Sequence, residues 1–170
     1  MKKIAVLTFI LFYTGCATIH SPIPENYTGP ISIISSTDKR HHSSKADMFY
    51  LQGIDGKVIK NAIGETRRAS YGQGGKLTTV HPDIEVPSKE ATFTIVGRTE
   101  YAMPIQALTN AVYEVKGDIV FSPISNEKYI VKGALGKEYS SVWLEVKGTG
   151  EVIKNKIEIQ GNSSLGFFDK

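Results

Sequence analysis

Apolar and polar residues alternate with a period of two along several short segments of the chain. The clearest segment, 91–100, places Phe93 and Ile95 on one side and threonines on the other. Such alternation is typical of a β-strand with one face in a core. The other segments that we expect to be extended are 30–37, 48–54, 57–62, 77–86, 111–122, 128–135, 141–146 and 152–159.

Helical periodicity is weak throughout the chain. No window of eleven or more residues repeats its apolar positions every three to four residues, and only 63–69 and 105–111 have room for one turn each. Asp55-Gly56, between two predicted strands, is typical of a type I′ hairpin turn, in which both residues have positive φ. Gly117, inside the segment 111–122, is expected to form a β-bulge.

Seven or eight short strands separated by turns predict an all-β protein. We expect a single antiparallel β-sandwich of the immunoglobulin-like or transthyretin-like type over 31–160, with a flexible tail at 161–170. The length of 170 residues fits one domain, and 16 glycines with 7 prolines agree with many turns. The segment 37–47 is predicted to be a polar loop. Trp143, on a predicted strand, is expected in the core with its indole N–H bonded to a carbonyl.

The first residues differ in character from the rest. Lys2 and Lys3 precede ten nearly all-apolar residues, which are too few to span a bilayer and have the length of a signal-peptide core. We therefore predict a signal peptide over 1–15. The segment 16–30 has three prolines and no periodicity, which indicates a linker.

The signal segment ends in Thr14-Gly15-Cys16-Ala17, with Tyr13 before it. This stretch resembles the lipobox of bacterial lipoproteins, although Leu is commoner in the family where Tyr13 stands. The resemblance implies that Cys16 becomes the mature N-terminus, with acyl chains such as palmitate attached. Ala17 is not the Asp that retains Gram-negative lipoproteins at the inner membrane, so the resemblance implies an outer-membrane anchor.

Charge and cysteine content exclude some classes of protein. Removal of Lys2 and Lys3 from the 20 basic residues leaves 18 against 17 acidic ones, a net charge of +1. Nucleic acid is therefore not an expected partner, because phosphate binding needs a basic surface. A single cysteine also excludes an intramolecular disulfide.

Motifs for catalysis or metal binding are weak. The neighbours His41 and His42 point to opposite sides of an extended chain, whereas zinc or copper needs three or four convergent ligands. We expect both to be solvated. The glycine-rich segment 71–77 lacks the Walker spacing, and no serine lies in Gly-x-Ser-x-Gly. We accordingly expect no metal, no cofactor and no enzymatic activity.

The region 66–76 combines cations, an aromatic side chain and glycines. Loops of this composition are adaptable and often carry binding residues. The candidate partner-binding residues are Arg67, Arg68, Tyr71, Gly72 and Gly74.

Three further pieces, Phe49-Tyr50-Leu51 with Ile54-Asp55-Gly56-Lys57, residues 128–133 and residues 142–145, occur in an order that resembles small bacterial lipoproteins with a β-sandwich domain. The architecture is also similar to that of the sandwich lipoprotein of type VI secretion systems. The resemblance implies a fold and an envelope location, with no catalytic residue to transfer.

These observations together predict a lipid-anchored protein of the cell outer membrane that faces the periplasm. We expect it to bind another envelope component, a protein, in a tethering or accessory role. One alternative is a small-ligand or metal binder that uses the inside or mouth of the sandwich. Another is a hydrolase of cell-wall or glycan material, since paired carboxylates have no local sequence signature.

Overall fold

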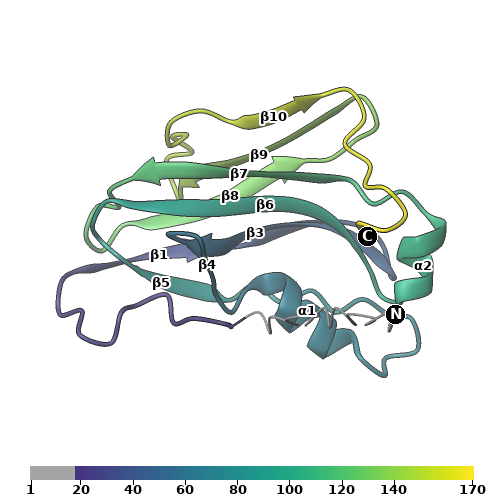
Figure 1. Ribbon diagram of the computed structural model, residues 1–170, viewed down its shortest axis with the longest axis horizontal. Helices are drawn as coiled ribbons and strands as arrows, with labels where there is room; N and C mark the ends of the chain where they lie inside the picture. The colour runs from purple at the N-terminus through teal and green to yellow at the C-terminus, as the bar shows by residue number, and fades with distance from the viewer. Residues whose placement is uncertain (1–17) are drawn as a thin grey trace, which may run out of the picture.

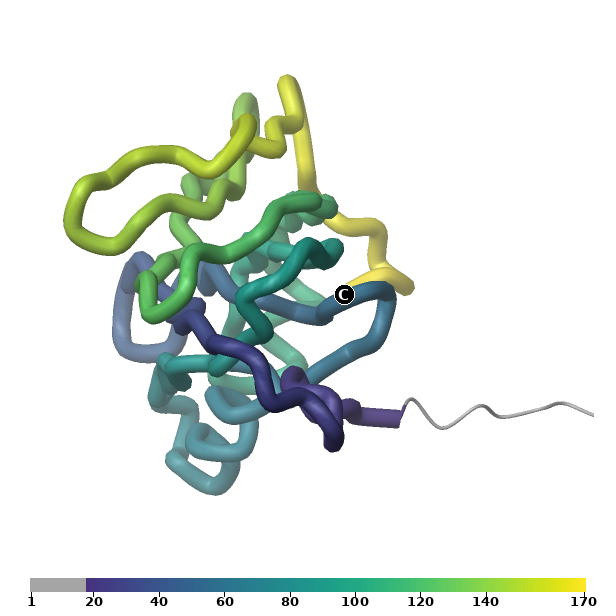
Figure 2. The backbone as a smooth tube through the Cα atoms, turned by 90° about the vertical axis from the view of Figure 1, so that its left-hand side faces the viewer, coloured from purple at the N-terminus to yellow at the C-terminus, as the bar shows by residue number. Residues whose placement is uncertain are grey.

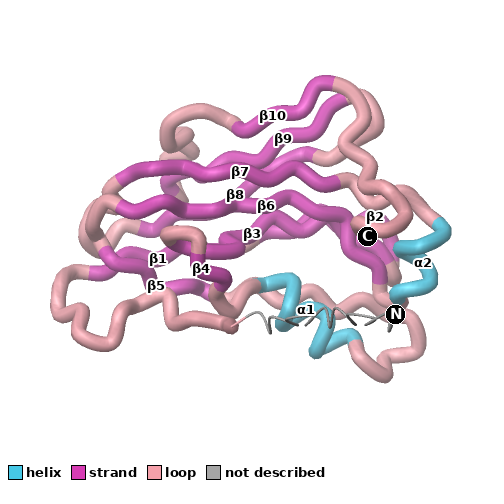
Figure 3. Tube along the Cα trace, in the orientation of Figure 1, coloured by secondary structure: helices cyan, strands magenta, loops and turns pink. Residues whose placement is uncertain are grey.

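The computed structural model of the protein describes residues 18–170. Figure 1 and Figure 3 show strands running along the long axis of the molecule, with one helix across the lower side and a second helix at one end. The elements are β1 (Ile31–Ser35), β2 (Thr37–His42), β3 (Lys45–Ile54), β4 (Lys57–Val58), α1 (Ala62–Ser70), β5 (Asp83–Pro87), β6 (Ala91–Tyr101), α2 (Pro104–Thr109), β7 (Glu114–Phe121), β8 (Lys128–Ala134), β9 (Tyr139–Val146) and β10 (Ile157–Gln160).

The strands form two sheets, which confirms the predicted all-β, sandwich-like fold. The first sheet has the order β10-β9-β8-β1-β5, and the second has the order β2-β3-β6-β7 with β4 beside β3. The strand pairs are antiparallel except β1–β8, within the described residues. In that parallel pair Ile34 lies opposite Tyr129. The prediction of a purely antiparallel sandwich is therefore wrong at this one pair. A hairpin can only join antiparallel strands, whereas β1 and β8 are far apart in sequence and are free to pair in parallel.

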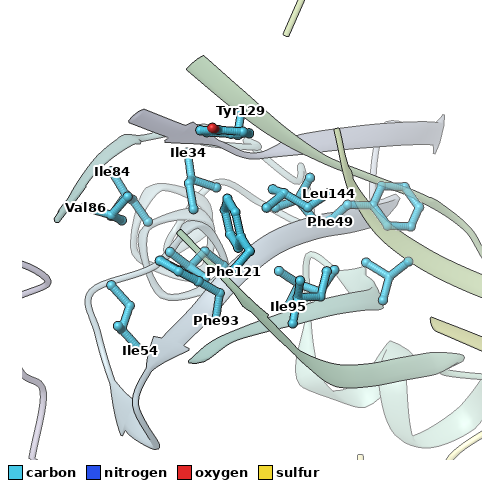
Figure 4. Packing of buried hydrophobic residues seen from close by; sticks show 14 of the residues in the cluster. Ile34, Phe49, Ile54, Ile84, Val86, Phe93, Ile95, Phe121, Tyr129 and Leu144 are labelled. Atoms are coloured by element: carbon cyan, nitrogen blue, oxygen red, sulfur yellow. The ribbon is translucent and has the colours of Figure 1, made fainter. Parts of the chain in front are cut away.

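The main core lies between the two sheets. Figure 4 shows side chains from both sheets pointing toward one another. Phe121 packs between Phe93 and Tyr129, with ring centroids 4.9 and 5.3 Å away, respectively. The buried members of this core are Ile34, Phe49, Leu51, Ile54, Ile59, Ile84, Val86, Ala91, Phe93, Ile95, Val115, Ile119, Phe121, Tyr129, Val131, Val142 and Leu144.

The outer face of β3 and β6 is also covered. Met48, Tyr50 and Val96 are buried there with Ile63 of α1 and Leu77 of the following loop. The alternation in 91–100 was therefore interpreted correctly for Phe93 and Ile95, which face the main core. Val96 points the other way and packs under the helical layer.

The prediction of a polar loop over residues 37–47 is wrong. The chain forms β2, turns at residues 43–44 and enters β3 at Lys45. β2 is an edge strand of its sheet, and its last four residues are exposed. Charged and polar residues are characteristic of edge strands because they discourage pairing with another chain. Polarity alone therefore did not distinguish this edge strand from a loop.

The turn at Asp55-Gly56 is confirmed, with φ values of 50° and 73°. The return strand is much shorter than the predicted 57–62, since β4 has two residues. The side chain of Asn61 accepts a hydrogen bond from the Gly64 amide and starts α1 instead. α1 and α2 occur where single turns were expected, but they extend over nine and six residues.

Gly117 does not form a bulge, because β6 and β7 pair without a shift in register. A Cβ atom there would lie 2.8 Å from the Ile157 side chain, so glycine at this position makes room for Ile157. The register of β3 and β6 shifts instead between Leu51 and Gly53. The hydrophobic pattern of the sequence cannot distinguish a glycine that forms a bulge from a glycine that leaves room for a neighbouring side chain.

Trp143 is not a core residue, contrary to prediction. Its indole N–H donates to the Glu145 carboxylate at 2.8 Å, and Lys156 Nζ lies 4.1 Å from the ring centroid. It pairs across strands with Lys132, which is exposed. Alternation along β9 puts Val142 and Leu144 in the core and turns Trp143 outward.

The segments that flank the sandwich make backbone hydrogen bonds to it. The His20 amide donates to the Val58 carbonyl at 2.9 Å, within the expected linker. Two hydrogen bonds attach the expected tail: the Glu114 amide donates to the Ser163 carbonyl, and the Leu165 amide donates to the Val112 carbonyl. The yellow tail in Figure 2 accordingly runs back along the fold from the end of β10.

Candidate binding pocket beside the second sheet

A pocket of about 430 Å³ lies at one end of the second sheet, outside the core. Pockets of this size hold small molecules or a few side chains of a partner. The end of α1, the end of β6, α2 and the C-terminal residue contribute to its walls. The lining residues are Arg67, Ser70, Tyr71, Arg98, Thr99, Glu100, Tyr101, Ala102, Pro104, Ala107, Leu108, Val112 and Lys170.

One wall contains a bidentate ion pair between α1 and β6. Arg67 Nε and Nη2 donate to the two Glu100 carboxylate oxygens at 2.6 and 3.0 Å. The hydrogen bond to Glu100 raises the pKa of Arg67. Glu100 is nearly buried, whereas more than half of the Arg67 side chain is exposed. The pair therefore holds α1 against the sheet and leaves part of the guanidinium open to a ligand.

A second ion pair lies on the same side of the second sheet. Arg98 Nη1 donates to Glu114 Oε2 at 2.5 Å, across β6 and β7. Arg98 Nε is buried and has no hydrogen-bond partner among residues 18–170. Burial, followed by the nearby Glu114 charge, raises the pKa of the buried Tyr50 hydroxyl well above its usual range. Arg98 therefore contributes a second guanidinium to the lining of the pocket.

Lys170 closes the pocket near α2. Its Nζ donates to the carbonyls of Asn110 at 2.7 Å and of Leu108 at 3.5 Å. No carboxylate lies within 4.0 Å of this ammonium in the part of the chain that the structure describes. Lys170 thus lines the pocket as a cation that is bonded only to neutral groups.

The candidate residues proposed from sequence occupy different environments. Arg67 and Tyr71 line the pocket. Arg68 is exposed and pairs with Glu65 three residues earlier at 3.0 Å, so it stabilises the helix locally. Gly72 and Gly74 lie in the turn after α1 with φ of 75° and 61°, a conformation that favours glycine. Cys16 lies outside the described residues.

Apolar side chains are exposed on α2, at the end of α1 and near the C-terminus, three segments that contribute residues to the pocket. α2 has no buried residue, and the exposed fractions of Ile105 and Leu108 are 60% and 40%. Tyr71 is 90% exposed, which is unusual for an aromatic residue at the end of a helix. Close to the C-terminus, Phe167 and Phe168 stack edge to face and are also exposed. Exposed apolar side chains beside a pocket are typical of interaction surfaces.

The histidines do not converge. His41 Nε2 lies 2.7 Å from the buried carboxylate of Asp47, which also accepts from Thr99 Oγ1 at 2.8 Å. His41 is exposed, as expected, and its ring also contacts a buried carboxylate of the sandwich. His81 pairs with Asp38. Within residues 18–170, no group of three or more potential ligand side chains is arranged to hold a metal ion.

Sequence reasoning missed most of this pocket. Arg98 and Glu100 continue the alternation of β6 on its outer face, so their side of the sheet was predictable from Phe93 and Ile95. Nothing in the local pattern placed them opposite α1. α2 is too short for a periodic signal, and Lys170 joins the site only through tertiary contacts.

Comparisons with protein-family models, with curated proteins and with solved structures produced no match to this chain. The site is therefore interpreted from its own chemistry. Among the described residues, no helix is long and apolar enough to cross a bilayer.

Proposed function

We propose that the chain is a lipid-anchored envelope protein that binds another envelope component, a protein, without catalysis. In this proposal the anchor is acylated Cys16, the membrane is the outer membrane, and the domain faces the periplasm. The sandwich would be of the immunoglobulin-like or transthyretin-like type. The support for the anchor is the basic start, short apolar run and Thr14-Gly15-Cys16 order of the sequence.

The observation that carries the binding role is the exposed Tyr71 beside a pocket. Tyrosine supplies a large contact area at low entropic cost and is enriched among binding hot spots. Arg67, also a pocket residue, is held in position by Glu100. The turn through Gly72 and Gly74 adds backbone that a partner can approach closely.

The anchor would act by raising local concentration. Acyl chains contribute about 0.8 kcal/mol per buried CH₂, so two or three chains hold a protein on a membrane. Confinement to the same surface as the partner then makes a weak contact effective. A protein that works in this way needs no deep catalytic cleft.

The test is a pull-down from detergent-solubilised envelopes with wild type, Cys16→Ala and Tyr71→Ala in parallel. We expect wild type in the outer-membrane fraction with a defined partner, Cys16→Ala released from the membrane, and Tyr71→Ala membrane-bound without the partner. Ile124→Ala is a suitable control because Ile124 is 66% exposed and does not line the pocket. A partner captured equally by Tyr71→Ala would remove this surface from the proposal.

The second candidate function is small-ligand binding, which the pocket volume specifically favours. The sequence suggested that such a ligand would lie inside the sandwich or at its mouth. The space between the sheets is filled by the main core, and the pocket lies outside it.

A further inference from the structure

We infer that the pocket between α1, β6 and α2 binds a small single-chain amphiphile with one anionic head, such as a medium-chain carboxylate. This inference concerns a ligand site and does not depend on a protein partner or on the lipid anchor. It rests on three features of the pocket: its volume, its apolar walls and the Lys170 ammonium, which has no carboxylate within 4.0 Å among residues 18–170.

The walls suit an apolar chain. Leu108, Val112 and Tyr101 contribute aliphatic and aromatic surface, and Pro104 with Ala107 adds small apolar groups. A volume of about 430 Å³ lies at the small end of the range for ligand pockets. The site therefore fits one short chain better than a complete two-chain lipid.

The charges select the head group. The lining side chains include three cations, Arg67, Arg98 and Lys170, and one acid, Glu100. Arg67 and Arg98 each have a carboxylate partner, whereas the Lys170 ammonium, within the described part of the chain, is bonded only to two carbonyls. An ammonium beside apolar walls favours a negatively charged ligand group over a neutral or positive one. The carboxylate is accordingly assigned to Lys170, with the exposed side of Arg67 as a second contact.

The experiment uses the full chain in phosphatidylcholine vesicles and a decanoate probe that carries a diazirine on its alkyl chain. After photolysis, mass spectrometry locates the labelled peptides. We expect label on segments that line the pocket, and loss of label when unlabelled decanoate is added in excess. A decylamine probe with the same diazirine should label these segments about tenfold less, because it loses a charge-assisted contact and gains a repulsion.

Two variants test the pocket and the cation separately. Ala107→Trp fills the cavity and should abolish labelling, whereas Ile124→Trp, at a 66% exposed position outside the lining, should leave it unchanged. Lys170→Gln keeps a donor for the two carbonyls and removes the charge, and we expect labelling to fall about tenfold. Circular dichroism on each variant shows whether it is folded.

Three results would overturn the inference. They are equal labelling by the decylamine probe, full labelling of folded Ala107→Trp, and competition by phosphatidylglycerol vesicles but not by decanoate. The last result would assign the site to a lipid headgroup. A failed pull-down with intact labelling would reject the protein partner and keep the ligand site, so the two proposals fail independently.

Discussion

The space between the sheets and the layer outside the second sheet are built differently. Among residues 18–170, the inner core contains 17 buried apolar residues from both sheets, whereas the outer layer contains seven from β3, β6, α1 and the loop after α1. The outer layer adds two Arg–Glu pairs, a pocket and exposed apolar side chains. The first region holds the fold together, and the second has the adaptable, partly open chemistry that binding requires.

The largest expected effect is the loss of stability on truncating a side chain of the inner core. Phe93 is fully buried and contacts Phe121, so Phe93→Ala should lower the free energy of unfolding by about 3–5 kcal/mol. Urea denaturation followed by tryptophan fluorescence measures this change. Phe168→Ala is the control, since Phe168 is 96% exposed and its truncation should be nearly neutral. Similar losses in the two variants would contradict the comparison.

A smaller effect is expected where α1 meets the sheet. Glu100→Gln removes the charge that holds Arg67 in a bidentate pair and should cost about 1–2 kcal/mol, reduced by the exposure of Arg67. Glu65→Gln, which weakens the exposed pairs of Glu65 with Arg68 and Lys60, should cost at most about 0.5 kcal/mol. The difference is measured by urea denaturation, and added salt should reduce it. Equal costs would mean that the pair does not anchor the helix.

The outer face of the first sheet should respond to acid. Burial alone raises the pKa of Glu145, but hydrogen bonds from Lys132 and Trp143 and the charges of Lys132 and Lys156 together lower it below 4.5. A lowered folded-state pKa means that the ionised form stabilises the protein above pH 4.5 and that this contribution disappears as the pH falls through the folded pKa.

We expect a contribution of about 0.5–1 kcal/mol, because half of Lys132 is open to solvent. Glu145→Gln should flatten the fall in stability below pH 4.5 in thermal melts recorded across that range. A wild-type-like pH profile in this variant would assign the acid sensitivity to other carboxylates.

The smallest expected effect on stability belongs to the binding surface. Tyr71→Ala should change the free energy of unfolding by no more than about 0.5 kcal/mol, because the side chain is 90% exposed. Thermal denaturation tests this directly. A large loss would show that Tyr71 is structural and would weaken its role in binding.

The sequence predicted elements best where local physics decides the outcome. Alternation in 91–100 reflects a strand with one face in the main core, and β6 follows it. Asp55-Gly56 turns as expected because few other residues accept positive φ at adjacent positions. The same local reasoning failed at Thr37–His42, where a polar edge strand resembles a loop, and at Trp143, whose size suggested the core but whose position in β9 faces outward.

For the candidate site, composition alone indicated Arg67 and Tyr71, and the fold brings both to one pocket. It could not indicate Lys170 or Leu108, because these residues reach the site through the path of the chain after β10 and β6. Their neighbours in sequence carry no pattern that specifies a pocket.

The sequence by itself determined the β-rich class, because side-chain alternation and turn residues act over a few positions. Only the tertiary structure decided the parallel contact of β1 with β8, the pairing of Arg67 with Glu100, and the position of Lys170 beside α2. These contacts join residues that are 33 to 95 positions apart, and they depend on how the sheets pack rather than on local preference.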